Sequence, residues 1–288
     1  MPAHAPHAGD DLYGERDEIM QTIHDSRHAL ATLDDAGIGT LQLRDAGKLN
    51  IVGTPAIGEL RAALHTLAAT PALRVLVLRG HSEHAFIGGA DIGEMAQLTP
   101  ATAKVFITGL AALCDAVMQV PVPVVARITG WCLGGGLEVA LACDLRLCDD
   151  SAVFGMPEVK VGIPSVIHAA LLPRLIGQAR SDWLLLTCEN IGAEQAERWG
   201  LVHERCAPDG LDALVQQRAS ALAALPPHAL RQQKHLLQHW HTASLQQAVQ
   251  HSIDAFAQAY TSGEPQALMG EFMARKLARS KSRTQPPG

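Results

Sequence analysis

The sequence has few aromatic residues and no excess of positive charge. Aromatic side chains make up 4% of the 288 residues although hydrophobic residues reach 48%, so we expect a core built from Ala, Leu and Val. The formal net charge of −6 argues against a broad nucleic-acid-binding surface. Since no uninterrupted apolar run reaches about 18 residues, we expect a soluble protein without a membrane span.

Motifs of metal and disulfide sites are also missing. The six cysteines form no C-x-x-C pair and the fourteen histidines form no H-E-x-x-H, so we expect reduced core thiols and no metal site. The N-terminal residues lack both an apolar core and an arginine-rich amphipathic pattern, so we expect neither a secretion signal nor an organelle presequence. We therefore expect a flexible tail on a cytoplasmic protein.

Predicted strands and helices alternate along most of the chain, which is typical of the α/β class. The predicted strands cover residues 38–43, 73–79, 122–128, 145–148 and 201–206. The predicted helices cover residues 54–69, 99–120, 137–143 and 193–199. Thr54-Pro55 and Thr99-Pro100 mark helix starts, and Gly200 is a helix end. After Leu211 the periodicity is helical. We predict an N-terminal tail and helical lead-in (1–36), an α/β core (37–208) and a C-terminal helical region (209–288).

The most informative segment is Ile128-Thr-Gly-Trp-Cys-Leu-Gly-Gly-Gly-Leu-Glu138. It predicts a strand, a tight turn and a helix whose first N–H groups lack partners and favour negative charge. The spacing of its glycines matches neither G-x-G-x-x-G nor G-x-x-x-x-G-K-S/T, so a nucleotide-binding loop is not favoured. A second carboxylate, Glu158, follows Glu138 by 20 residues. The segment therefore predicts bare amides beside two acidic groups, which suits oxyanion stabilisation combined with proton transfer.

A second glycine segment follows the predicted strand at 73–79. It reads Phe86-Ile-Gly-Gly-Ala-Asp-Ile92 and again places small residues between a strand and a helix. Because ligand sites of α/β proteins collect outside strand ends, both segments are expected to contribute to one site.

Three blocks of this sequence, at 86–92, 134–144 and 154–158, resemble the signature motifs of the crotonase (enoyl-CoA hydratase/isomerase) superfamily. The order of the blocks also matches, and the similarity extends from about residue 38 to residue 279. The resemblance implies a crotonase-like spiral of ββα units with a C-terminal helical trimerisation region. It also implies an acyl-CoA thioester as substrate, with no separate cofactor because CoA is part of that substrate.

The resemblance assigns catalytic groups to four positions. The backbone N–H groups of Ala90 and Gly135 are expected to form an oxyanion hole for the thioester carbonyl, worth roughly 3–4 kcal/mol per donor. Glu138 is expected mainly to hold and deprotonate water, and Glu158 to protonate the α-carbon. Burial and mutual repulsion would separate the proton affinities of the two glutamates.

The acyl-CoA is expected to contact residues of all three blocks and of the last helix. These are Phe86, Gly88, Gly89, Asp91, Ile92, Gly134, Pro157, Val166, His168, Phe272 and Lys276. The chain departs from many hydratases at Val166, Ile167 and His168, where relatives carry a glycine-rich stretch, so the acyl group is left open. His168 is expected either to assist with a polar acyl group or proton transfer, or to be purely structural.

The pair of glutamates favours an enoyl-CoA hydratase. The alternatives are an enoyl-CoA isomerase, an acyl-CoA hydrolase of the same superfamily, or a non-catalytic oligomeric scaffold. The resemblance implies a homotrimer or hexamer, and no nucleic-acid or membrane partner is expected.

Overall fold

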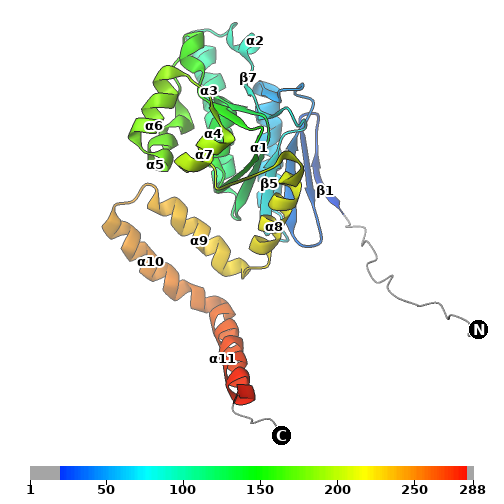
Figure 1. The fold of residues 1–288 in the computed structure, drawn as a ribbon, viewed down its shortest axis with the longest axis vertical. Helices are drawn as coiled ribbons and strands as arrows, with labels where there is room; N and C mark the ends of the chain where they lie inside the picture. The colour runs from blue at the N-terminus through cyan, green and yellow to red at the C-terminus, as the bar shows by residue number, and fades with distance from the viewer. Residues whose placement is uncertain (1–19, 284–288) are drawn as a thin grey trace, which may run out of the picture.

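The structure is a computed structural model that describes residues 20–283. Its main sheet has seven strands in the order β1-β2-β3-β5-β8-β10-β13. Figure 1 shows the fold, with β1 and β5 of this sheet labelled. The first three strands pair antiparallel and the later ones parallel. Their bounds are Gln21–Asp25, Ala29–Leu33, Ile38–Leu43, Val75–Arg79, Val124–Ile128, Leu145–Asp149 and Glu204–Cys206.

Two smaller sheets complete the β-structure. One has the order β12-β11-β9-β6 and the other pairs β4 with β7. The bounds are β4 Ile51–Val52, β6 Ala85–Ile87, β7 Gly89–Ala90, β9 Trp131–Leu133, β11 Val153–Gly155 and β12 Ile191–Gly192. Because β5, β8 and β10 of the main sheet are each followed by a strand of the second sheet, the chain advances as a spiral of ββα units, as expected.

The helices follow these strand pairs. Their bounds are α1 Thr54–Ala68, α2 Ile92–Met95, α3 Pro100–Gln119, α4 Gly135–Ala142, α5 Leu172–Ile176, α6 Gln178–Asp182, α7 Ala193–Trp199, α8 Leu211–Ala223, α9 Pro227–Trp240, α10 Leu245–Ala259 and α11 Glu264–Arg283. Short 3-10 turns include η1 Glu158–Val161 and η2 Ile167–Leu171, and η3 Trp183–Thr187 is a single π-helical turn.

The predicted helical lead-in is wrong where the structure describes it. Residues 21–33 form the β1–β2 hairpin, which extends the main sheet. In β2, Ala29, Ala31 and Leu33 are buried and the residues between them are half-buried, which is the period of two that a strand requires. Residues 1–19, predicted as a flexible tail, lie outside the described residues.

The predicted start of α3 is confirmed, and that of α1 differs by one residue. Thr99 caps α3 and forms a capping box with Thr102. At α1 the N-cap is Gly53, and Thr54 is the first helical residue. The Glu94 carboxylate accepts hydrogen bonds from the Thr54 N–H and hydroxyl, so a side chain 40 residues away supplies the cap.

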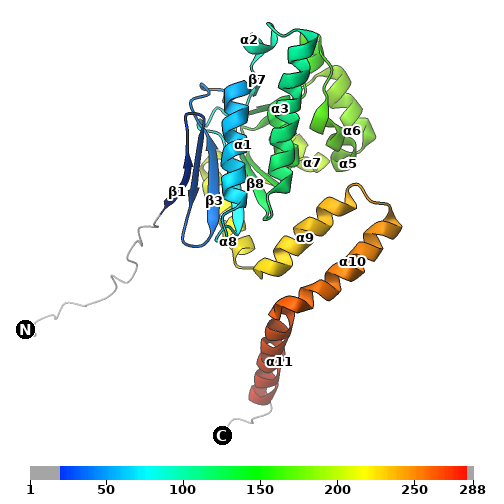
Figure 2. The same cartoon turned by 180° about the vertical axis from the view of Figure 1, so that it is seen from behind.

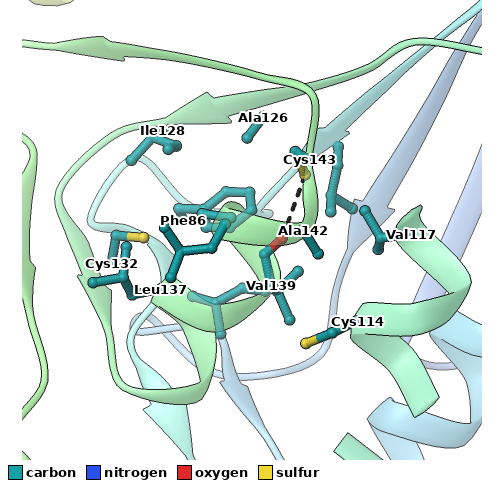
Figure 3. Close-up of a cluster of buried hydrophobic side chains, with 14 of the residues drawn as sticks. Phe86, Cys114, Val117, Ala126, Ile128, Cys132, Leu137, Val139, Ala142 and Cys143 are labelled. Carbon is teal, nitrogen blue, oxygen red and sulfur yellow. Dashed lines mark hydrogen bonds between the residues drawn. The ribbon is translucent and has the colours of Figure 1, made fainter. Parts of the chain in front are cut away.

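Helices cover both faces of the main sheet. On one face α1, α3 and α4 bury a large apolar cluster, and Figure 3 shows the part of it around Phe86, Leu137 and Cys143. On the other face α8 covers Val77, Val125 and Leu147 with its own apolar side chains. The sequence placed this helix in the C-terminal region, but its packing makes it part of the core.

One described helix, α3, has the length and apolarity of a membrane span. Its Phe106, Leu110 and Val117 side chains are buried within the cluster formed with α1 and α4. The same features characterise the core helix of a soluble protein.

The last three helices leave the body of the molecule. Figures 1 and 2 show α9 and α10 as an antiparallel hairpin below the core, and α11 projecting away from it. Lys234 of α9 joins this hairpin to the sheet, because its buried ammonium donates to the Val122 carbonyl and to Asp144 Oδ2, both at 2.8 Å.

Candidate active site

The glycine turn before α4 is shaped by close contacts. Gly134 has a φ of +51°, and a Cβ there would overlap Glu158 Oε1. A Cβ at Gly136 would overlap the Ile87 carbonyl oxygen. Both glycines are therefore needed for α4 to begin directly against the end of β6 and beside Glu158.

Two backbone amides at this place are free of regular pairing. Ala90 lies opposite Val52 in the parallel β4–β7 ladder, while the next amide, that of Asp91, donates to the Val52 carbonyl at 3.0 Å. Since successive N–H groups of a strand point in opposite directions, the Ala90 N–H faces away from β4, on the side where β7 pairs with no strand among residues 20–283. Gly135 opens α4, which contacts β7, and its N–H has no intrahelical acceptor.

Glu138 lies on the first turn of α4 and is only 3% exposed. Its Oε1 accepts a hydrogen bond from the Ala169 N–H at 3.0 Å. Burial raises the pKa of Glu138 to about 8, the hydrogen bond opposes this rise, and the negative charge of Glu158 adds to it. Glu138 therefore favours its neutral form at pH 7.

Glu158 begins η1 and is half-buried. Its Oε2 accepts a hydrogen bond from the Ser165 hydroxyl at 2.8 Å. Burial raises the pKa of this carboxyl too, and the Ser165 hydrogen bond counteracts the rise.

The two carboxyls are close enough for the charge of one to change the proton affinity of the other. Burial is nevertheless the larger cause of the raised pKa of each carboxyl. With a pKa of about 8, Glu138 favours its protonated form at pH 7, whereas the roles inferred from the resemblance need a proton on Glu158 when the α-carbon is protonated. The pair therefore offers one acid and one base beside the bare amides.

Several predicted substrate contacts lie around this pair. Gly134 and Pro157 flank Glu158, and Gly88 and Gly89 lead into Ala90. The side chains of Ile92 and Val166 are exposed at 61% and 40%, so a ligand could contact them.

Three predicted contacts have other partners in the structure. Phe86 is fully buried in the apolar cluster (Figure 3) and is not accessible to a ligand. The Asp91 carboxylate accepts the Glu94 N–H at 3.1 Å and caps α2. The His168 ring lies against Asp115 of α3, with Nε2 3.3 Å from Oδ1. Burial lowers the pKa of His168, and Asp115 counteracts this.

Phe272 and Lys276 are not brought to the glutamates within this chain. Both are exposed on α11, the helix that points away from the core in Figures 1 and 2.

Sequence reasoning missed three residues that hold the site in place. Ser165 and Ala169 supply the donors to the two carboxyls. Asn50 is fully buried, and its Nδ2 donates to the carbonyls of Ala85 at 2.7 Å and of Phe86 at 3.3 Å, which fixes β6. For Ser165 and Ala169 the only signal in the sequence was the absence, after Pro164, of the glycine-rich stretch that relatives carry.

Comparison with known proteins identifies the family of the chain. The model of the family described as "Enoyl-CoA hydratase/isomerase" matches residues 34–278. The chain is 30% identical over 243 residues to a probable enoyl-CoA hydratase, echA8, of Mycobacterium bovis, covering 84% of this chain and 93% of that protein. It is 28% identical over 242 residues to a crotonyl-CoA hydratase of Syntrophomonas wolfei, covering 84% and 93%. The crystal structure of an enoyl-CoA hydratase subunit I from Geobacillus kaustophilus superimposes with a TM-score of 0.81 at 31% identity, covering 86% and 95%.

Proposed function

Since the chain belongs to the enoyl-CoA hydratase/isomerase family, we propose that it is an enoyl-CoA hydratase, which adds water across the double bond of a 2-enoyl-CoA. The observation that carries this proposal is the pair of carboxyls, buried Glu138 and half-buried Glu158, beside the bare amides of Ala90 and Gly135. An acid and a base are both needed, because hydration delivers a hydroxyl to the β-carbon and a proton to the α-carbon.

The amides bind the thioester carbonyl. As water attacks the β-carbon, negative charge moves to the carbonyl oxygen, and the N–H groups of Ala90 and Gly135 stabilise this enolate. The ionised carboxyl of the pair accepts a proton from the water, and the neutral carboxyl donates its proton to the α-carbon. The pair ends with the same total number of protons, so hydration needs no net proton from solvent.

We propose a homotrimer or hexamer in the cytoplasm as the functional form. The apolar side chains exposed on α10 support a further protein contact. Leu245, Val249, Ile253 and Phe256 are 82%, 51%, 59% and 67% exposed, and together they line an open groove with Trp240. In such an assembly Phe272 and Lys276 would reach a substrate only in a neighbouring subunit.

The test is the loss of conjugated enoyl-thioester absorbance with crotonyl-CoA. Wild-type protein is expected to hydrate the substrate. Glu138→Gln and Glu158→Gln are each expected to lower kcat about 10²- to 10⁴-fold, the usual contribution of a general acid or base. Full activity in either variant would contradict a mechanism that uses both carboxyls. Conversion of a 3-enoyl-CoA without hydration of crotonyl-CoA would favour the isomerase, thioester cleavage the hydrolase, and no turnover of any of them the scaffold.

A further inference from the structure

We propose that Ser165 is a positioning residue for Glu158, whose hydroxyl fixes the carboxylate in the orientation that serves the reaction. The Ser165 hydroxyl donates to Glu158 Oε2 at 2.8 Å. The other oxygen, Oε1, lies against Gly134, where a Cβ would overlap it. The carboxylate is thus held from one side by a donor and bounded on the other by the glycine turn. The importance of this contact for turnover rests on the proposed hydratase function.

The local backbone explains why a residue seven positions along the chain reaches back to Glu158. The Gly162 N–H donates to the Val159 carbonyl at 3.1 Å, and the Ile163 N–H donates to the Glu158 carbonyl at 3.2 Å. Gly162 has a φ of +84°, which glycine adopts at little cost. The chain therefore turns back after η1 and brings the Ser165 side chain to the carboxylate.

The same short segment also contacts the other glutamate. Ala169, four residues after Ser165, donates its N–H to Glu138 Oε1 at 3.0 Å. Between the two contacts Ile167 has a φ of +39°, which is costly for a β-branched residue. Strained backbone persists only where its surroundings hold it in place, and it gathers at functional sites. Residues 165–169 thus link the positions of both carboxyls.

The hydroxyl has a defined electrostatic effect. A donor stabilises the ionised form of a carboxyl, and burial destabilises it. At Glu158 burial is the larger influence and Ser165 works against it. Removing the hydroxyl should therefore raise the pKa of Glu158 and reduce the fraction of sites with a base ready at neutral pH.

The experiment uses the full chain carrying Ser165→Ala, with Ser165→Thr as the variant that keeps the hydroxyl. Ser220→Ala, at an exposed position of α8, is the matched control. The pKa of Glu158 is measured by carboxyl ¹³C NMR of glutamate-labelled protein, with the signal assigned by its loss in Glu158→Gln. The kcat and KM for crotonyl-CoA hydration are measured on the same samples.

Ser165→Ala is expected to raise the pKa of Glu158 by about one to two units, the usual worth of a hydrogen bond to a charged group. It is expected to lower kcat about 10- to 100-fold with little change in KM. Ser165→Thr should restore both quantities, and Ser220→Ala should leave them unchanged. If Ser165→Ala does not fold, Ser165→Cys keeps the volume with a weaker donor and should still raise the pKa.

An unchanged pKa of Glu158 in the folded Ala or Cys variant would overturn the proposal. The NMR titration needs no turnover, so it separates the two ideas. A wild-type protein that hydrates no enoyl-CoA would count against the hydratase function, while the titration would still decide whether Ser165 holds Glu158.

Discussion

The core around the glutamates and the C-terminal helices differ in how much of their hydrogen bonding and packing is supplied by the same chain. In the core each carboxyl has a donor from the same chain, and the glycines are fitted to their neighbours so closely that a Cβ would overlap them. On α10 and α11 large apolar side chains such as Leu245 and Phe272 are exposed at 82% and 64%. The two glutamates are thus held by contacts within one chain, whereas large apolar side chains of the last helices are left exposed by it.

The largest difference in activity is expected between two glycine-to-alanine variants, one in the core and one on α11. In the core, Gly136→Ala would place a Cβ against the Ile87 carbonyl oxygen and move α4 with Glu138, so we expect hydration to fall more than about 10²-fold. Gly270→Ala on α11 meets nothing within 4 Å and should stabilise the helix by up to about 1 kcal/mol. Crotonyl-CoA turnover and thermal unfolding of both variants measure the contrast. Equal losses of activity in the two variants would show that α11 is packed as tightly as the turn before α4.

The joint between the regions should give the next largest effect. Lys234→Met removes the buried ammonium that binds Asp144 and the Val122 carbonyl and leaves both acceptors without this donor. We expect the free energy of unfolding to fall by about 2–3 kcal/mol, slightly less than for a fully buried pair because the Asp144 side chain is 31% exposed. Urea unfolding measures this loss, and an unchanged midpoint would mean that α9 is not joined to the core in this way.

Glu138 should make the core less stable at alkaline pH. Its pKa rises from an ordinary value of 4.5 to about 8 on folding, mainly through burial. A raised folded-state pKa supports stability at low pH, and this support is lost as pH rises from about 4.5 through about 8. Relative to wild type, Glu138→Gln should therefore be close to neutral at pH 4.5 and stabilising at pH 8.5, by at most about 5 kcal/mol for this difference in pKa. Thermal unfolding at both pH values is the measurement, with Glu271→Gln on exposed α11 as the control. A difference that does not depend on pH would contradict the burial of the ionisable group.

The smallest effect is expected on α11. If Lys276 reaches the substrate only across a subunit boundary, Lys276→Ala should raise KM for crotonyl-CoA a few-fold and leave kcat unchanged, as loss of one exposed charge contact implies. Steady-state kinetics at two salt concentrations measure this effect, because an exposed charge contact weakens with salt. A fall in kcat with unchanged KM would place Lys276 in the chemistry instead.

The parts of the fold that local pattern determines were predictable from the sequence. The continuous apolar runs that became β5 and β8 and the glycines before α4 were recognised because their signals lie within a few residues. The β1–β2 hairpin was missed although β2 alternates buried and half-buried residues, since a five-residue strand gives only a short alternation. The motif blocks led to both glutamates.

The contacts that hold the glutamates could not be predicted in the same way. His168 meets Asp115 and Ala169 meets Glu138 across 53 and 31 residues of sequence, and such pairings depend on how α3 and α4 pack. The pKa of Glu138 likewise depends on burial, which its place on the first turn of a helix does not reveal. Phe86 shows the reverse case, because its motif suggested a ligand contact and its place in β6 directs it into the core.

The proposed mechanism needs one neutral and one ionised carboxyl, Glu138 and Glu158, at neutral pH. The pH dependence of kcat/KM for crotonyl-CoA hydration between pH 5 and 10 reports the ionisation of the free enzyme and therefore measures this requirement. We expect a bell-shaped profile whose alkaline limb lies near pH 8, where Glu138 ionises. A value of kcat/KM that stays constant or rises between pH 7 and 10 would rule out a protonated Glu138 as the group that the reaction needs.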